Sequence, residues 1–458
     1  MLNVSDGAGA ITLARSHGVT SRPRGLTLHG SFSGTRIASH ASAGPLTPGA
    51  TPRVHEWWFR YNSVVRHLYL HVPFCHRRCS YCDFSIAVRK RIPAREYVDV
   101  VVRELDRVME NSPGWVNPGA ADPGREPGDP RSETLETIYF GGGTPSLLPA
   151  DSLSALLTSL RAAFHVTSSR DEVEVTLEAN PEDVTPDSAT SWHRAGINRI
   201  SLGAQSFDDR VLQWMHRSHD AARIGDAVRA IRAAGIDNIS LDLIFALPAE
   251  LRRDWARDLD LACALDPTHL SLYGLTVEER TPLARWISRG AAAAPDDERY
   301  ADEYLFAHMR LTTCGFHFYE VSNAVRDGRR SRHNTAYWSG RPYLGLGPAG
   351  HSFDGRARRW NVGAWEAYRH AIADGRSVVE AEEVLSDEQR ELERVYLSLR
   401  TDAGLPLAAF DHPLPPSTDL WVQRGWVEVT DQRLACRPEG WLRLEALVRD
   451  LTGAGRMV

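Results

Sequence analysis

The sequence predicts an α/β fold with a parallel sheet, and two observations support this prediction. From His67 onward, short runs rich in Val, Ile, Leu and Tyr end in Gly, Pro or polar residues, and a helical stretch of about 10–15 residues follows each run. Six such units in succession are typical of a parallel sheet with right-handed crossovers. In addition, glycine-rich and polar segments follow the ends of several runs, which is where parallel sheets place functional side chains.

The expected elements follow one another along the chain without long gaps. We expect strands at His67–Pro73, Thr134–Gly141, Glu172–Ala179, Arg199–Gln205, Asn238–Leu247 and His269–Thr276. We expect helices at Ala94–Glu110, Ala150–Phe164, Asp187–Ala195, Ala221–Ala234 and Asp254–Ala264. Each expected strand is bounded by turn residues, and Ser112–Arg131, rich in Pro, Gly and Asp, is predicted to be a solvated loop.

The two ends of the chain differ from this core. Residues 1–66 are rich in Gly, Ser, Thr, Ala and Arg and poor in acids, which predicts a disordered extension. Such a start also resembles an organellar transit peptide, although a mis-assigned start codon or a dispensable tail is the preferred interpretation. We expect a core at 67–315, a segment completing it at 316–378 and a C-terminal domain at 379–458.

The C-terminal part is expected to be a small α/β unit. Asp296–Thr313 is predicted to be a helix that leads into an extended segment at Phe316–Val321, and Glu380–Leu399 is predicted to be largely helical. Trp421–Thr430 and Arg433–Arg437, joined by a short turn, are predicted to form a hairpin. Helices followed by a hairpin indicate a winged-helix-like domain, and the lack of a basic stripe favours a packing role over nucleic-acid binding.

Composition limits the function classes further. A chain of 458 residues, 42% hydrophobic and 24% charged, is an ordinary globular protein large enough for more than one domain. No run of about 18 apolar residues predicts a membrane-spanning helix. The net charge of −6 creates no overall attraction for nucleic acid. Six cysteines and no apolar signal segment at the start indicate a reducing compartment, so we expect a cytoplasmic protein.

Three cysteines form the most informative motif. Cys75, Cys79 and Cys82 have the spacing C-x3-C-x2-C directly after the first expected strand. Three thiolates in one loop can hold three irons of a [4Fe–4S] cluster and leave the fourth iron open to a small chelating ligand. The alternative is a zinc site completed by His71 or His76, but zinc loops usually supply two separated C-x2-C pairs. A disulfide framework is weaker still, given so few cysteines.

The cysteine loop resembles that of the radical SAM superfamily, whose members bind S-adenosylmethionine (SAM) at the open iron. The resemblance is closest to the branch that contains oxygen-independent coproporphyrinogen III dehydrogenase and the heme chaperone HemW, and it runs from about Tyr69 to the C-terminus. It implies a partial, TIM-like (β/α)6 barrel. The motif Gly141-Gly142-Gly143-Thr144-Pro145 follows a strand and resembles the glycine motif that binds the methionyl amino group of SAM.

Polar residues near other strand ends are candidates for SAM contacts. Glu178 ends the third strand, and the carboxylate of Asp242 interrupts an apolar run, so it needs a partner or a ligand. Gln205, taken alone, is equally well explained as a hydrogen-bonded core residue. For Arg217, taken alone in so Arg-rich a chain, a solvated helix residue is the preferred interpretation. The resemblance implies that six residues match SAM-contacting positions: Tyr69, Tyr81, Glu178, Gln205, Arg217 and Asp242.

A second motif suggests heme. His333, Tyr337 and Trp338 lie in an H-N-x-x-Y-W sequence, and an imidazole beside aromatic rings suits heme iron and its macrocycle. The alternative is a structural, hydrogen-bonded histidine. The motif is associated with the HemW-like group, which implies that His333 is a heme contact. Relatives often carry a cysteine where this chain has Ser331, so a thiolate ligand is excluded there.

The resemblance also separates two functions. The dehydrogenases carry a fourth cysteine two residues after the third, whereas this chain has Phe84, as HemW-like proteins do. We therefore expect a heme chaperone that binds a [4Fe–4S] cluster, SAM and heme and passes heme to acceptor proteins, with peripheral membrane contact as a further expectation. No residue is assigned a catalytic role. The alternatives are oxidative decarboxylation of coproporphyrinogen III and a radical SAM reaction on an unrelated substrate.

Overall fold

The fold is built on one large sheet. The computed structural model describes residues 65–111, 135–164, 172–409 and 413–453. Nine strands pair in the order β11-β1-β4-β5-β6-β7-β8-β10-β9. The six strands from β1 to β8 in that order are all parallel, which confirms the predicted α/β class. They span His67–Val72 (β1), Thr137–Gly142 (β4), Glu174–Ala179 (β5), Arg199–Gln205 (β6), Asn238–Phe245 (β7) and His269–Gly274 (β8).

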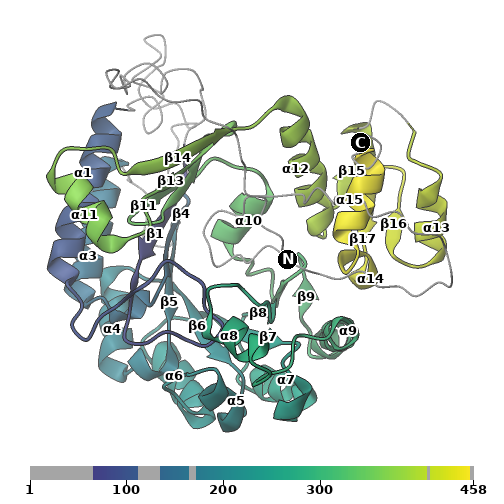
Figure 1. Ribbon diagram of the computed structural model, residues 1–458, viewed down its shortest axis with the longest axis horizontal. Helices are drawn as coiled ribbons and strands as arrows, with labels where there is room; N and C mark the ends of the chain where they lie inside the picture. The colour runs from purple at the N-terminus through teal and green to yellow at the C-terminus, as the bar shows by residue number, and fades with distance from the viewer. Residues whose placement is uncertain (1–64, 112–134, 165–171, 410–412, 454–458) are drawn as a thin grey trace.

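The parallel strands are buried on both sides, as their apolar sequences require. All six residues of β1 are buried, and β4 to β8 are nearly as inaccessible. The helices after the strands line the outer, convex side of the curved sheet (Figure 1). They are α1 (Ala94–Asn111), α3 (Ala150–Ala163), α4 (Pro186–Ala195), α5 (Asp209–Trp214), α6 (Ala221–Ala233), α7 (Trp255–Ala264) and α9 (Asp297–Thr313). The predicted helices agree with these within about a residue at each end.

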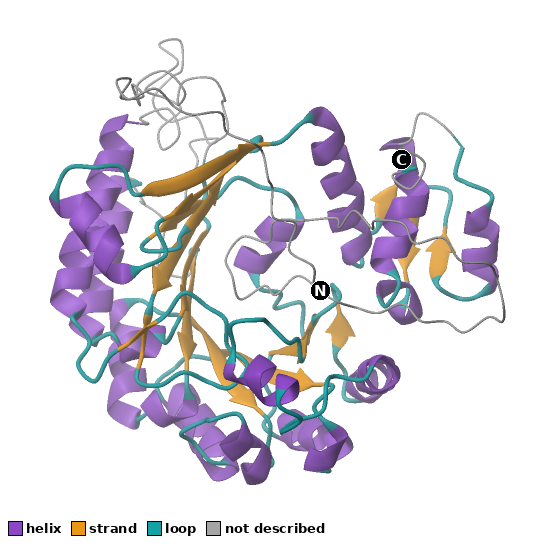
Figure 2. Ribbon diagram, in the orientation of Figure 1, coloured by secondary structure: helices purple, strands orange, loops and turns teal. Residues whose placement is uncertain are grey.

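Both edges of the sheet are formed by chain that follows the sixth unit. β11 (Leu344–Leu346) pairs in parallel with β1, directly after α10 (Arg332–Trp338), which contains the H-N-x-x-Y-W motif. At the other edge, β10 (Asn323–Val325) pairs antiparallel with β8, and β9 (His317–Phe318) pairs with β10. The sheet therefore has two separate edges and curves as an incomplete barrel. Figure 2 shows α10 on the inner side of this curve.

A second sheet follows. It contains β12 (His351–Phe353), β13 (Ala357–Asn361) and β14 (Val379–Val384), all antiparallel, with α11 (Trp365–Ala373) between β13 and β14. The predicted helix at Glu380–Leu399 is thus wrong over its first part. Residues of β14 alternate in exposure as an edge strand does, and the helix α12 begins only at Asp387, after a capping box formed by Ser386.

The C-terminal part is a small α/β unit, as expected. The hairpin of β16 (Val427–Val429) and β17 (Arg433–Cys436) is confirmed, and β15 (Leu405–Pro406) adds a third strand. The start of the predicted strand at Trp421–Thr430 is wrong, because residues to Gln423 belong to helix α13. The unit's helices are α12 (Asp387–Arg400), α13 (Ser417–Gln423), α14 (Pro438–Trp441) and α15 (Leu444–Thr452). The predicted boundary at residue 379 would separate β14 from its partner strand β13. The division of the chain into domains stays a prediction.

Some expectations fall on chain that the structure leaves undescribed. The predicted extension at 1–66 lies outside the described residues except for its last two, and so does nearly all of the loop Ser112–Arg131. Within the described residues, no helix combines the length and apolar character needed to cross a membrane. The remaining short elements are β2 (Phe74–Cys75), β3 (Ala87–Val88), α8 (Pro282–Ser288) and short 3₁₀ turns at Pro145–Leu147, Pro181–Asp183, Ala249–Leu251 and Leu407–Ala409.

Candidate functional site

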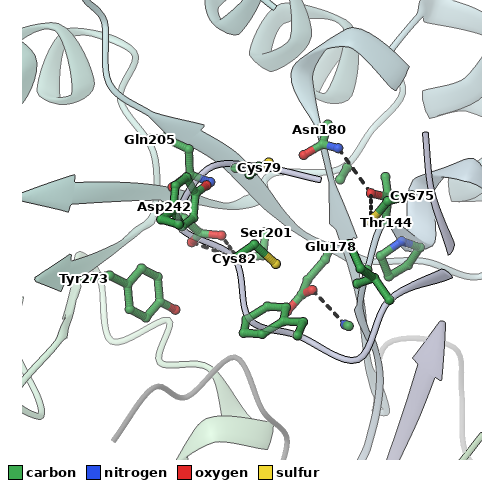
Figure 3. Close-up of a pocket in the computed structure, with 18 of the residues that line it drawn as sticks. Cys75, Cys79, Cys82, Thr144, Glu178, Asn180, Ser201, Gln205, Asp242 and Tyr273 are labelled. Carbon is green, nitrogen blue, oxygen red and sulfur yellow. Dashed lines mark hydrogen bonds between the residues drawn. The ribbon is translucent and has the colours of Figure 1, made fainter. Parts of the chain in front are cut away.

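A cavity of about 370 Å³ lies at the carboxyl ends of the parallel strands. Every site residue predicted from the sequence lines it. These are Tyr69, Cys75, Cys79, Tyr81, Cys82, Gly142, Gly143, Thr144, Glu178, Gln205, Arg217, Asp242 and His333. Figure 3 shows the three cysteines around the same space as Glu178 and Asp242. Parallel strands bring these separate segments together because their carboxyl ends share one edge.

The cysteine loop is held in place by backbone hydrogen bonds. It lies between β2 and β3, which pair in parallel, and the Arg89 N–H donates to the Cys75 carbonyl at 2.9 Å. On the opposite side, the Ser80 N–H donates to the carbonyl of Met215 at 3.1 Å. The loop is therefore fixed both to its own strand and to the chain after α5.

Two polar groups point at the sulfur atoms. The Thr144 hydroxyl donates to Cys75 Sγ at 3.3 Å, and Arg217 Nη1 lies 3.6 Å from Cys79 Sγ. Burial raises the pKa of Cys75 to about 11 and that of Cys82 to about 12. Without a metal these thiols stay protonated, whereas a bound metal converts coordinating thiols to thiolates. Donors aimed at sulfur are the arrangement that stabilises metal-bound thiolates.

The glycine motif shapes the wall beside Cys75. A Cβ atom on Gly143 would stand 2.7 Å from the Phe74 carbonyl oxygen and 3.0 Å from Cys75 Sγ. Gly142 has φ +108°, which side-chain-bearing residues rarely adopt. The two glycines therefore let the backbone pass close to the sulfur and keep the cavity open at this point.

Glu178 occupies a central place in the cavity. Its carboxylate accepts hydrogen bonds from the Tyr139 hydroxyl at 2.8 Å and the Gly142 N–H at 3.2 Å. Burial, together with the nearby charge of Asp242, raises the pKa of Glu178 to about 7. Such a carboxyl group can bind a cation or hydroxyl of a ligand, and it gains its charge near neutral pH.

Arg217 links several parts of the site. Its Nη2 donates to Asn180 Oδ1 and, at 3.0 Å, to the Gly203 carbonyl, while its Nε, though buried, has no partner among the described residues. It is not the solvated helix residue that composition alone suggested. Gln205 ends β6 with φ +65° beside an irregularity in the β6–β7 pairing, which is a strained conformation of the kind found at ligand sites.

Asp242 has the partners that a buried carboxylate needs. Ser201 Oγ donates to it at 3.0 Å and Ser240 Oγ at 3.3 Å. Burial still raises the pKa of Asp242. We expected the Asp242 carboxylate to need a partner or a ligand, and its position on the cavity wall agrees with this expectation.

His333 lies within a group of aromatic rings. Its ring stacks on that of Tyr139 at a centroid distance of 5.0 Å, and on Tyr69 at 6.4 Å. Its Nδ1 is 2.7 Å from Thr137 Oγ1, and its Nε2 is 2.8 Å from the Tyr337 hydroxyl. Burial lowers the pKa of His333 well below its ordinary value, so the ring is neutral.

Known proteins that resemble this chain agree with a site of this kind. A model of the radical SAM superfamily matches residues 128–262. The heme chaperone HemW of Mycobacterium tuberculosis is 36% identical over 396 residues, which cover 84% of this chain and 94% of that protein. The chain belongs to the HemW family.

Two further relatives agree with this assignment. HemW of Bacillus subtilis is 32% identical over 356 residues, covering 78% of this chain and 88% of that protein. Among solved structures, coproporphyrinogen III oxidase (HemN) from Escherichia coli, described as a radical SAM enzyme, has a TM-score of 0.70 at 20% identity. The match covers 86% of this chain and 92% of that one, and it shows a shared fold.

Membership of the radical SAM superfamily implies a [4Fe–4S] cluster and SAM, and the residues of this HemW-family chain fit both. Three cysteines line one cavity with donors toward two of their sulfurs. Within the described ranges, no three His, Cys, Asp or Glu side chains converge closely enough for a single metal ion.

Sequence reasoning did not single out several residues that build the site. Asn180 joins Arg217 to Thr144, whose Oγ1 lies 3.5 Å from Asn180 Nδ2, and Tyr139 stacks on His333 while it donates to Glu178. Asn180 follows the end of a predicted strand directly, and a polar residue at that position is a candidate for the site. The inward-facing Tyr139 lies within a strand, where nothing in the local pattern distinguishes it from core.

Proposed function

We propose that this chain is a heme chaperone of the radical SAM type, which binds a [4Fe–4S] cluster, SAM and heme and delivers heme to acceptor proteins. The main support is that the three-cysteine loop, the glycine motif and the H-N-x-x-Y-W helix, which are far apart in the sequence, border one cavity. Phe84 also borders it, where the dehydrogenases have a fourth cysteine. The cytoplasm is the compartment proposed for this activity, with contact at the membrane surface during heme delivery.

In this proposal Cys75, Cys79 and Cys82 hold three irons, and Thr144 and Arg217 stabilise the bound sulfurs. The cluster supplies an open iron and an electron when SAM is bound. The other residues hold SAM by charge and hydrogen bonds along the strand ends. They are Tyr69, Tyr81, Gly142, Gly143, Glu178, Gln205, Arg217 and Asp242.

Heme is the cargo, and α10 is its proposed contact. His333, Asn334 and Tyr337 on this helix reach the cavity, and aromatic side chains surround them. Flat rings and a polar atom suited to iron are what a heme site requires. Acceptor proteins would take heme from this side of the cavity.

The deciding experiment uses the full chain, reconstituted anaerobically with iron and sulfide. We expect iron and sulfide in cluster stoichiometry, a change in the cluster EPR spectrum on adding SAM, and a Soret shift on adding heme. Heme should then pass to an apo-form of a heme protein. Incubation with coproporphyrinogen III, SAM and reductant should yield no protoporphyrinogen IX. Formation of that product without heme transfer would support the decarboxylase instead.

A matched pair of cysteine variants tests the cluster assignment. Cys79→Ala should lose most of the reconstituted iron, because one of three ligands is gone. Cys263→Ala removes a cysteine on α7 that does not line the cavity, and it should load normally. Colourless protein that retains zinc in stoichiometric amount would refute the cluster.

A further inference from the structure

Both ring nitrogens of His333 are already engaged within the protein. Nδ1 lies 2.7 Å from Thr137 Oγ1, and Nε2 lies 2.8 Å from the Tyr337 hydroxyl. The side chain is 1% exposed, and the His333 N–H donates to Glu174 Oε1 at 3.1 Å, which fixes the start of the helix. An iron atom bound to either nitrogen would have to break one of these hydrogen bonds inside a packed aromatic group.

Tyr337 is better placed to meet a ligand. It follows His333 by one helical turn, is only half-buried, and lines the cavity. Its hydroxyl is held by His333 Nε2, and its ring packs edge-on against Tyr343 at a centroid distance of 4.6 Å. A tyrosine oxygen is an established axial ligand of ferric heme in proteins.

A hydrogen-bonded chain behind His333 sets the direction of this hydroxyl. Thr137 Oγ1 lies 3.0 Å from His67 Nδ1 as well as 2.7 Å from His333 Nδ1, and both histidines are buried. A hydrogen bond to one ring nitrogen fixes the tautomer and orientation of a histidine, as it does for histidines at metal sites. The imidazole is therefore held rigidly with Nε2 toward the phenol.

We infer that the Tyr337 oxygen, and not the His333 imidazole, is the atom that binds the iron of ferric heme, and that His333 is a positioning residue. The inference rests on the proposed heme-binding function and names its iron ligand. The step is balanced when ferric heme arrives as its hydroxide. The phenol O–H and the Fe–OH bonds break, the Fe–O(Tyr337) bond forms, and water leaves without any change in oxidation state. His333 then donates Nε2–H to the bound oxygen and accepts from Thr137.

The phenol of Tyr337 loses its proton only when it binds the iron. Burial, with Tyr343 and Glu178 nearby, raises the pKa of Tyr337 well above its ordinary value, so the free phenol is neutral. Ferric iron is the stronger Lewis acid of the two heme oxidation states. The site should therefore bind ferric heme more tightly than ferrous heme.

The test compares variants of the full, cluster-reconstituted chain by EPR and resonance Raman spectroscopy of added ferric heme. The oxidised cluster is diamagnetic, so the ferric heme signal stands alone. Wild type should show a high-spin ferric signal with phenolate vibrations. Tyr337→Phe should lose the phenolate vibrations and weaken heme binding by about tenfold or more. Thr137→Val should keep them, with weaker binding, because only the orientation of His333 changes.

Tyr343→Phe is the matched control. Tyr343 contacts Tyr337 but does not line the cavity, so its variant should keep the wild-type spectrum and affinity. An unchanged spectrum in Tyr337→Phe, combined with loss of an imidazole signature in His333→Gln, would overturn the inference and leave the chaperone proposal standing. Wild-type protein that fails to bind heme at all would instead refute the heme-binding function itself.

Discussion

The Thr144 hydroxyl donates a hydrogen bond to Cys75 Sγ over 3.3 Å. Thr144 comes from the glycine motif after β4, and Cys75 ends β2 at the start of the three-cysteine motif, so this contact joins the two most recognisable motifs of the chain. A hydrogen bond to a cluster sulfur favours the reduced, more negative state of the cluster. At the proposed cluster site, this contact would therefore influence electron transfer.

Thr144→Val should lower the reduction potential of the reconstituted cluster. Loss of one hydrogen bond, worth about 1 kcal/mol, corresponds to roughly 40 mV for one electron. An EPR-monitored redox titration measures this shift. Thr144→Ser keeps a hydroxyl and should stay near the wild-type potential, and equal shifts in both variants would show that the methyl group, not the hydrogen bond, matters.

Gly143→Ala should impair cluster loading. The new methyl group would meet the Phe74 carbonyl at 2.7 Å, and such overpacking costs about 1–3 kcal/mol. The loop must move to relieve the contact and so displaces Cys75. Iron content after reconstitution is the measurement. Gly225→Ala is the control, because its Cβ would meet nothing closer than 3.4 Å and it lies inside helix α6.

SAM affinity should rise with pH through the range in which Glu178 ionises. Burial raises the pKa of Glu178 to about 7, and the charged form attracts the cationic ligand, so affinity should increase up to about tenfold from pH 6 to pH 8. Anaerobic titration calorimetry on the cluster-loaded protein measures this. Glu178→Gln should bind more weakly at pH 8 and lose the slope.

Glu182→Gln is the matched control for that slope. The hydrogen bond from His219 and the charge of Arg217 outweigh burial and lower the pKa of Glu182 to about 2. This acid stays ionised throughout the range, so its variant should keep the pH slope. If the pH dependence of SAM affinity vanished in Glu182→Gln and persisted in Glu178→Gln, the assignment of this titration to Glu178 would be wrong.

Glu104 should make the fold less stable as pH rises. It is buried on α1 and accepts from the Gly347 N–H, the Asn361 amide and the Tyr368 hydroxyl. Burial raises the pKa of Glu104 to about 7, above its unfolded value of about 4.5. The folded state therefore holds the proton more tightly, and its contribution is present below pH 4.5 and lost as pH rises through 7. The loss is on the order of 3 kcal/mol.

Urea unfolding at pH 5 and pH 7.5 tests this for wild type and Glu104→Gln. Buried histidines act in the opposite sense, since burial lowers the pKa of His71 to about 4. The quantity to follow is therefore the difference between the two proteins. Wild type should lose more stability, relative to the variant, on going to pH 7.5, and a constant difference would contradict the prediction.

The strands and helices of the core were predictable because their signal is local. β6 begins and ends where the sequence indicated, and α4 follows its N-cap Thr185, which forms a capping box with Ser188. Local pattern failed at β14, whose residues Val379–Val384 suit a helix in isolation but pair with β13. Pairing with a distant strand overrides weak helix propensity.

The sequence by itself predicted the chemistry that we propose for this chain. Cys75, Cys79 and Cys82 lie close together in the sequence, and the glycine motif follows one strand. Their spacing, together with the resemblance to the radical SAM superfamily, predicted the cluster and its neighbour. Only the tertiary structure decided which groups meet. Arg217 contacts Cys79, which lies 138 residues away in the sequence, and His333 contacts Thr137, which lies 196 residues away. The other ring nitrogen of His333 is hydrogen-bonded to the Tyr337 hydroxyl. The physical reason is that hydrogen bonds act over about 3 Å, and the register of a parallel sheet, not the order of residues, sets such distances.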